Sequence, residues 1–313
     1  MTATDKCGPD SWHTRLAYVA DRHFAKLALG PIIGLLTIAA VVPFAIMLAL
    51  SFTDFSFNLP GHDGGFVGFA NYLRAVLEDQ RFHESLKLQT IFLACTLPVE
   101  FVMGLWISIG LWRSGAVSKQ VLPLLAIPML LAPVTVGMIW RLLLHGDYGP
   151  IGYYVTRMPA LQIDSILGSP TTAFLAVAFV DIWQWTPFFA IVLLAGLHSL
   201  PQEPFQAAMV DGASRSRVLW TLTIPLLRPA ITVALLIRFM DSFKEFDKIF
   251  VLTRGGPASA TELVSVYTWI VSFEHGELSY GSAVTILIYL MIYVACVGLF
   301  WTARKDWRQR GAN

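Results

Sequence analysis

The sequence has little charge and few cysteines for its length. Only 14% of its 313 residues are charged, whereas 56% are hydrophobic, a balance outside that of ordinary soluble domains. Cys7, Cys95 and Cys296 lie far apart in the chain, and two of them fall within apolar runs. This spacing predicts neither a disulfide framework nor a metal site, so we interpret the cysteines as packing residues.

Several catalytic motifs are also missing. No Gly-Lys dipeptide occurs, so the chain has no phosphate-binding loop and is not expected to bind or hydrolyse ATP by itself. The seven histidines form no HExxH or other short metal-binding spacing, and there is no GxSxG motif. A membrane-embedded enzyme therefore ranks lowest among the possible functions. The net charge of +1 gives no indication of a nucleic-acid partner, and no cofactor or metal is expected on this chain.

Long apolar runs dominate the remainder of the sequence. A helix needs about 20 predominantly apolar residues to cross the roughly 30 Å hydrocarbon core of a bilayer. Six runs reach that length, namely residues 27–52, 89–112, 121–144, 171–197, 229–252 and 281–303. The sequence therefore predicts an all-α membrane protein with six transmembrane helices, in one domain over residues 27–313.

A polar segment, residues 1–26, precedes the first apolar run. It lacks the apolar region and the small-residue cleavage site of a secretory signal. On a helical wheel, Trp12, Leu16 and Val19 share one side, while basic residues fall on a neighbouring side. Two interpretations stay open: a short helix on the inner membrane surface, or a disordered basic tail.

Two of the apolar runs are unusual. The third contains Pro123, Pro128 and Pro133, which predict kinks in its helix. The fifth contains six charged residues within eleven positions, and each would cost roughly 2.5–3.5 kcal/mol at the membrane centre. Those charges must therefore face a bundle interior or a water-filled cavity. Their spacing predicts pairs along one helix, namely Arg238–Asp241, Asp241–Lys244, Lys244–Asp247 and Glu245–Lys248.

The distribution of lysine and arginine predicts the orientation. With both termini inside, the inner segments hold thirteen basic residues and the outer loops hold five. Because basic residues are enriched on the cytoplasmic side, this asymmetry favours cytoplasmic N- and C-termini. The same orientation places the segment between the fourth and fifth runs in the cytoplasm.

That segment, about residues 199–228, is moderately polar and predicts two short helices joined by a turn. Residues 206–210 are good helix formers, and Gly212 suits a residue that ends a helix and redirects the chain. Asp211 or Ser214 can cap a second helix over residues 214–222, which Pro225 and then Pro229 are expected to terminate. A helical hairpin of this kind offers a rigid knob to the groove of a partner protein.

The hairpin resembles the coupling loop of permease subunits of binding-protein-dependent ABC importers. That loop reads Glu-Ala-Ala, three residues, Gly, nine residues and Ile-x-Leu-Pro; here Gln206 replaces Glu, Leu and Ile are exchanged, and the spacing is retained. Two further strings, residues 66–72 and 253–257, resemble the carbohydrate-uptake type, the maltose/glycerol-phosphate permease-like family. The residues that this resemblance assigns to contact with an ATPase are Gln206, Ala207, Ala208, Asp211, Gly212, Ala213 and Pro225.

The resemblance implies a fold and a set of partners. The fold would be that of a type I ABC importer permease in a bacterial plasma (inner) membrane. The partners would be a second homologous permease subunit in a heterodimer, two ATPase subunits that hold ATP and Mg, and an extracytoplasmic solute-binding protein. The function implied is ATP-driven import of a sugar or polyol, with ATP hydrolysis on the separate ATPase.

The candidate solute path combines a tryptophan cluster with the charged fifth run. Aromatic faces suit the C–H surfaces of sugars, and carboxylates and amides suit their hydroxyl groups. The candidates are Trp183, Gln184, Trp185, Asp241, Lys244, Glu245 and Asp247. Two alternatives stay open: the tryptophans are packing or interfacial residues, and the charges form a paired network that stabilises the helix.

Two other transport functions also stay open. Basic residues in the fifth run could meet a phosphate, so a glycerol-phosphate-like solute is an alternative to a sugar. An ion-coupled secondary transporter would show inverted repeats with paired broken helices, whereas only one charged run occurs here. Glu100 and Asp181 are intramembrane carboxylates that could serve a proton relay, or line a cavity, or bond to neighbouring helices.

Overall fold

The computed structural model describes residues 12–58, 60–61, 63–158 and 163–310, with side chains outside 12–28, 116–119 and 302–310. The described chain is helical, and an isolated bridge between Thr53 and Phe66 is the one β-type pairing seen there. The longer helices are α1 (Trp12–Leu50), α3 (Gln80–Ser114), α4 (Ala116–Leu130), α5 (Pro133–Leu143), α7 (Pro170–His198), α10 (Ile224–Ser242) and α13 (Leu278–Arg310).

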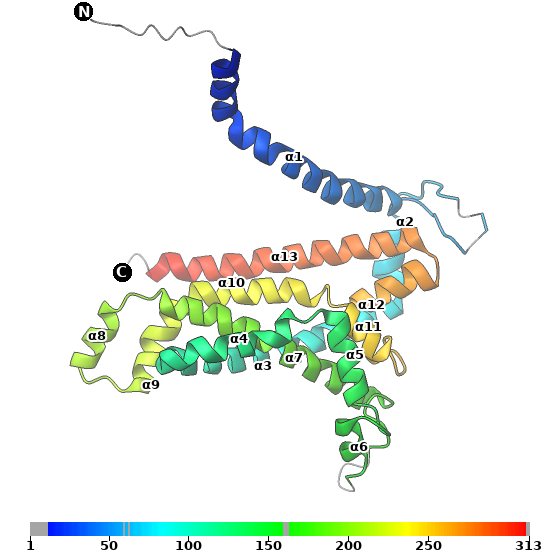
Figure 1. Cartoon of the computed structure of the whole chain (residues 1–313). Helices are drawn as coiled ribbons and strands as arrows, with labels where there is room; N and C mark the ends of the chain where they lie inside the picture. The colour runs from blue at the N-terminus through cyan, green and yellow to red at the C-terminus, as the bar shows by residue number, and fades with distance from the viewer. Residues whose placement is uncertain (1–11, 59, 62, 159–162, 311–313) are drawn as a thin grey trace, which may run out of the picture.

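Shorter helices join these long ones. They are α2 (Ala70–Leu73), α6 (Pro150–Thr156), α8 (Glu203–Val210), α9 (Arg215–Val218), α11 (Asp247–Thr253) and α12 (Val264–Trp269). Three five-residue π-helical turns complete the set: η1 (Arg74–Glu78), η2 (Leu219–Thr223) and η3 (Ile270–Glu274). In Figure 1, α8 and α9 lie at one end of the bundle, while α2, α6 and α12 lie at the other.

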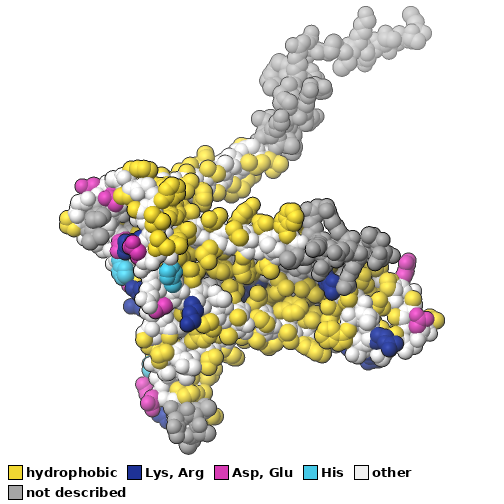
Figure 2. Space-filling view, turned by 180° about the vertical axis from the view of Figure 1, so that it is seen from behind, with side chains coloured by type: hydrophobic (Ala, Val, Ile, Leu, Met, Phe, Trp, Pro, Cys, Tyr) yellow, Lys and Arg dark blue, Asp and Glu magenta, His cyan; other side chains and the backbone are white. Residues whose placement is uncertain are grey.

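Within the described residues, five helices are long and apolar enough to cross a membrane, or six if one bent pair is a single span. Figure 2 shows a broad hydrophobic band over the bundle, with charged side chains gathered towards its ends. The predicted runs at 89–112, 171–197 and 281–303 lie within α3, α7 and α13. The all-helical membrane architecture predicted from composition is therefore confirmed, and the count agrees with six when the bent pair is joined.

The third predicted span, residues 121–144, is not one continuous helix. The chain bends by 90° between α4 and α5. Leu131 and Ala132 take extended conformations, with ψ of 138° and 134°, directly before Pro133. A residue that precedes proline is disfavoured in helical geometry, and proline itself suits the first turn of a new helix. Pro133 therefore breaks this span, whereas Pro123 and Pro128 stay inside α4.

The fifth predicted span, residues 229–252, is also wrong as a single helix. Helix α10 begins earlier, at Ile224, and ends at Ser242, and α11 starts only at Asp247. Pro225 and Pro229 do not terminate a helix, because Pro225 occupies the first turn of α10. Residues Arg215–Ser242 form one candidate span, so the second half of the hairpin runs directly into the membrane helix.

Helix α1 diverges from the rest of the bundle towards its N-terminus (Figure 1), while its C-terminal part lies against α13. It runs without interruption from Trp12 to Leu50, so the segment before the first span forms no separate helix from residue 12 onwards. Residues 1–11 lie outside the described part. The candidate span Leu29–Leu50 has none of its window buried in this chain. The residues directly after this span are held by Asn71, whose amide donates hydrogen bonds to the Ser51 and Thr53 carbonyls at 3.0 and 2.7 Å.

Helices α3 and α7 pack closely against each other. A Cβ added at Gly104 would lie 2.4 Å from the Cβ of Phe189, so only glycine permits this approach. Phe189 belongs to a buried cluster with Ile109, Leu193 and Leu197. Of the cysteines, Cys95 is exposed on α3 and Cys296 is half-buried, so the interpretation of Cys95 as a packing residue is wrong within this chain. Cys7 lies outside the described residues.

Candidate coupling hairpin and buried polar network

The hairpin predicted from the sequence is formed by α8 and α9 and the turn between them. Gly212 has φ of +68°, and the Ala213 amide donates to the Ala208 carbonyl at 3.0 Å across the turn. The Ser214 hydroxyl accepts a hydrogen bond from the Arg217 amide at 3.3 Å, so Ser214 and not Asp211 caps the second helix. A positive φ at the turn explains the requirement for glycine.

One side of the hairpin anchors it and the other side is free. Phe205 is buried against Trp112 of α3, with ring centroids 5.7 Å apart, and Ala208 is buried beside it. Met209 and Val210 are 70% and 88% exposed in this chain. Exposed apolar side chains on a rigid projection mark a contact surface. Among the predicted contact residues, the exposed ones are Gln206, Ala207, Asp211 and Gly212, while Ala213 and Pro225 are half-buried.

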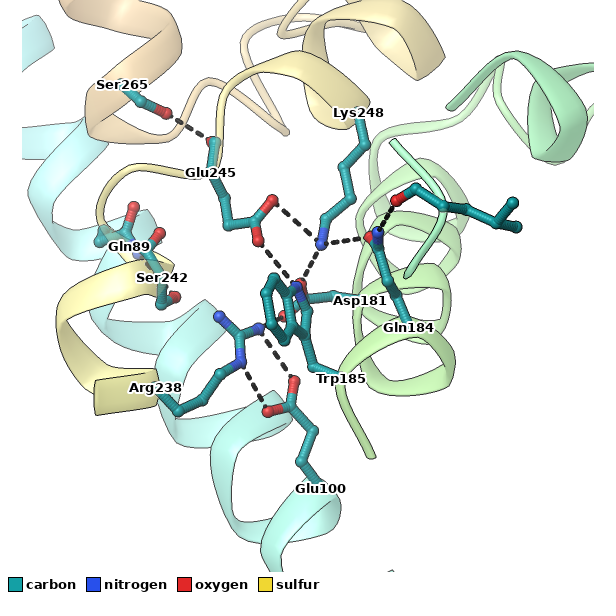
Figure 3. A network of polar contacts seen from close by, with 11 residues as sticks. Gln89, Glu100, Asp181, Gln184, Trp185, Arg238, Ser242, Glu245, Lys248 and Ser265 are labelled. Carbon is teal, nitrogen blue, oxygen red and sulfur yellow. Dashed lines mark hydrogen bonds and ion pairs between the residues drawn. The ribbon is translucent and has the colours of Figure 1, made fainter. Parts of the chain in front are cut away.

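A second group of polar side chains lies inside the bundle, where α3, α7, α10 and α11 meet (Figure 3). Arg238 of α10 is buried and donates two hydrogen bonds to Glu100 of α3, at 2.9 and 3.0 Å. The same guanidinium donates to Asp181 of α7 at 2.5 Å. This bidentate arrangement joins three long helices through one side chain.

Lys248 of α11 extends the network. Its ammonium donates to Asp181 at 2.5 Å and to the Gln184 amide oxygen at 3.2 Å, and it lies 3.0 Å from Glu245. The Trp185 indole N–H donates to Glu245 at 2.8 Å. The ring of Trp185 also faces both cations, with the Arg238 guanidinium carbon 5.0 Å from the ring centroid.

The network is a fully buried charge cluster with unequal signs. Glu100, Asp181 and Glu245 supply three carboxylates, and Arg238 and Lys248 supply two cations. Charges of this kind are stable in a low-dielectric interior only when each is paired and hydrogen-bonded. The cluster therefore holds the four helices together. Glu100 of α3 would lose its cation if α3 and α10 separated, and Asp181 of α7 is paired with cations of both α10 and α11.

The predicted pathway residues are divided between this cluster and other surroundings. Gln184, Trp185 and Glu245 belong to the cluster. Trp183 instead packs edge-on against Trp140 in the core, with centroids 5.4 Å apart. The others lie outside it: Lys244 and Asp247 are exposed, and Asp241 is half-buried.

The predicted pairing along the fifth run is correct in part. Asp241 and Lys244 form an ion pair at 3.6 Å, and Glu245 and Lys248 form one at 3.0 Å. Arg238 pairs across helices with Glu100 and Asp181 instead of with Asp241 of its own helix. Glu100 and Asp181 are therefore not isolated. They bond to neighbouring helices, which was one of the alternatives predicted for them, and they join the network with Arg238 and Lys248, which the pathway candidates did not include.

The sequence of this chain matches that of a known protein family. Residues 100–304 match the sequence profile of the family described as binding-protein-dependent transport system inner membrane component. The matched region includes the hairpin and every residue of the buried cluster. The chain belongs to this family. It is a permease with the sequence features of the carbohydrate-uptake type, as its relatives indicate.

Three relatives cover most of this permease. The sulfoquinovosyl glycerol transport system permease SmoG of Agrobacterium fabrum is 32% identical over 309 residues, covering 98% of each chain. The trehalose/maltose transport system permease MalF of Thermococcus litoralis is 34% identical over 231 residues, covering 72% of this chain and 76% of its own. A probable ABC transporter permease, y4oQ of Sinorhizobium fredii, is 31% identical over 280 residues and covers 87% of each chain.

A solved structure confirms the fold. A bacterial ABC transporter involved in the import of the acidic polysaccharide alginate contains a chain that superposes on this permease with a TM-score of 0.76. The two are 20% identical, and the match covers 93% of this chain and 99% of the other. At this identity the likeness establishes the ABC importer permease fold.

Proposed function

We propose that this chain is the membrane-spanning permease subunit of an ATP-driven ABC importer that translocates a sugar or polyol. The observation that carries the proposal is the identity of 30–34% to permeases named for trehalose, maltose and sulfoquinovosyl glycerol transport. The exposed hairpin supports it, because a chain without a phosphate-binding loop needs a surface on which a separate ATPase can act.

The proposed assembly contains a second homologous permease chain, two ATPase subunits that hold ATP and Mg, and an extracytoplasmic solute-binding protein. It lies in a bacterial inner membrane with both termini in the cytoplasm. The hairpin and the C-terminal end of α13 lie at the same end of the bundle, which supports a shared cytoplasmic side (Figure 1). The continuity of the helix also supports the coupling role of the hairpin, because α9, η2 and α10 form one continuous span from the hairpin into the bundle.

The proposed solute path runs beside the buried network. Lys244 and Asp247 keep exposed side chains next to it, and Asp241 is half-buried in a pair with Lys244, so these side chains can meet hydroxyl groups directly. Glu245, whose side chain is 7% exposed, follows Lys244 directly in the chain and pairs with Lys248 of the buried cluster. Trp183, Gln184 and Trp185 are proposed to position the residues of the path and not to touch the solute, since their own contacts are with protein groups.

The test is purification of the tagged chain in mild detergent from its native membrane, followed by identification of co-purifying subunits and an ATPase assay. Gly212→Val is expected to lose the ATPase subunit and sugar uptake, because φ of +68° disfavours a β-branched residue by about 1–2 kcal/mol or more. Gly212→Asn is the matched control and is expected to retain both, since asparagine tolerates this conformation. A chain without an ATPase partner, whose uptake stops when the ion gradient is removed, would refute the proposal.

A further inference from the structure

A polar cavity of about 380 Å³ lies at the end of the bundle remote from the hairpin. It is formed by η1, the start of α3, α12 with η3, and the start of α13. Its charged and aromatic lining includes Arg74, Glu78, Asp79, Arg81, Glu277 and Tyr280. Charged side chains also gather at this end of the surface in Figure 2.

The floor of the cavity is built around Asp79. Its carboxylate caps α3 by accepting a hydrogen bond from the Phe82 amide at 2.9 Å. It also accepts from the Tyr280 hydroxyl at 2.5 Å and from the Tyr267 hydroxyl. Asp79 therefore joins α3, α12 and α13 and has no remaining role as a free ligand. The floor is a fixed, negatively charged surface.

The rim carries two ion pairs and an unpaired carboxylate. Arg74 pairs with Glu277 at 2.5 Å, and Arg81 makes a two-pronged contact with Glu262 at 2.7 and 2.8 Å. The Arg74–Glu277 pair also borders a neighbouring cavity of about 150 Å³, which Asp54 lines. Glu78 is exposed on the rim, and among the described residues no ion pair includes it.

The two cavities together carry excess negative charge. Four carboxylates (Asp54, Glu78, Asp79 and Glu277) line the two cavities together with two guanidinium groups, those of Arg74 and Arg81, which leaves two negative charges in excess. A recessed surface of one sign attracts a partner of the opposite sign and accelerates its association. The excess negative charge therefore favours a cationic occupant.

The geometry argues against a sugar at this position. The guanidinium of Arg74 lies 4.0 Å from the centroid of the Tyr280 ring and covers the face on which a sugar could stack. Both tyrosine hydroxyls are committed to Asp79. The volume lies near the lower end of the about 300–1,000 Å³ typical of small-molecule sites, which suits one long side chain.

We propose that this cavity receives a lysine or arginine side chain of the extracytoplasmic solute-binding protein. The inference rests on the proposed function, since that function supplies a protein partner at this end of the permease. Glu78 is the free carboxylate that would meet the incoming cation, and the second carboxylate oxygen of Glu277 lies on the same rim. Docking there touches the junction that Asp79 makes between α3, α12 and α13.

The experiment uses the whole transporter in nanodiscs and the solute-binding protein that co-purifies with it. Glu78→Lys is expected to raise the dissociation constant of that protein about tenfold at low salt. The increase should be smaller at high salt, because salt screens the repulsion between the new lysine and the incoming cation. Glu84→Lys is the matched control: Glu84 is exposed near the start of α3 but does not line the cavity, and we expect a change of less than about twofold. ATP hydrolysis without the binding protein should be unchanged in both variants.

The outcomes separate this inference from the function on which it rests. The proposed role of the cavity would be refuted by an unchanged dissociation constant in Glu78→Lys, or by an equal loss of affinity in Glu78→Lys and Glu84→Lys. Stimulation of wild-type ATP hydrolysis by the binding protein would still support the importer function in that case. Failure of the wild-type transporter to respond to any solute-binding protein would overturn both. Glu277→Gln provides a second variant, expected to weaken binding about threefold, because it removes a rim charge without adding a positive one.

Discussion

Replacing Arg238 by methionine tests the buried network most directly. The change removes the cation that holds Glu100 by two hydrogen bonds and Asp181 by a third. Glu100 would then have no cation, whereas Asp181 would keep Lys248. The cluster would pass from three carboxylates with two cations to three with one. Removal of one partner of a buried ion pair costs about 3–5 kcal/mol, so we expect Arg238→Met to lower the free energy of unfolding by that amount.

Two further variants turn this expectation into a test of the pairing itself. Glu100→Gln keeps hydrogen-bonding capacity and removes the excess negative charge, so its loss should be well below that of Arg238→Met. The double variant Glu100→Met/Arg238→Met removes both charges and should recover most of the lost stability, because an apolar pair of similar volume is often neutral.

The assay is a denaturant titration of the protein in detergent, with Lys244→Met as the control. Lys244 lies beyond the end of α10, its side chain is 61% exposed, and its pair with Asp241 is a surface contact worth about 1 kcal/mol or less. If Arg238→Met costs no more than Lys244→Met, the cluster is hydrated and does not hold the helices together. If the double variant is as unstable as Arg238→Met, the penalty comes from lost packing and not from unpaired charge.

Three other expectations concern orientation, the solute path and acid stability. A reporter fused after His198 should be cytoplasmic, and an external reporter would refute the orientation and with it the coupling role of the hairpin. Asp241→Asn and Glu245→Gln should each change the kinetics of uptake by severalfold, and unchanged kinetics in both would make these residues structural. Burial alone would raise the pKa of Asp79, but hydrogen bonds from Tyr267 and Tyr280 have the larger combined effect and hold this pKa below its usual value. A lowered carboxyl pKa adds to the free energy of unfolding at pH values above the unfolded pKa of about 3.9, and this contribution is lost as the pH falls through the lower folded pKa. In a pH titration of unfolding, Asp79→Asn should therefore lose less free energy of unfolding in acid than the wild-type chain does.

The fold and the hairpin could be predicted because their signals are local. Apolar runs longer than a bilayer's thickness determine helices wherever they occur, and α7 matches its predicted run within one residue at each end. Gly212 was predicted to make a turn because only its own backbone conformation is involved. The capping residue was narrowed to Asp211 or Ser214, and the hydrogen bond to the Arg217 amide shows that Ser214 has this role.

The proline effects were harder to predict, because one residue type has opposite consequences at different positions. Pro225 was expected to end a helix, yet it lies in the first turn of α10, where its missing amide hydrogen is not needed. Pro133 was expected to kink a span, yet it separates two helices at 90°. Pro128 lies within α4. The sequence identifies where such breaks are possible, and packing of the neighbouring segments selects among them.

The sequence by itself determined that this chain is a helical membrane protein, that its fifth apolar run needs polar partners, and that a glycine-centred hairpin precedes that run. These properties follow from hydropathy, desolvation and backbone conformation, each of which acts over one helix or less. The tertiary structure alone decided the partners of Arg238. Glu100 and Asp181 lie 138 and 57 positions away in the sequence, and they meet Arg238 because α3, α7 and α10 pack side by side. A buried charge must be paired, but only the packing of distant helices determines which charge it meets.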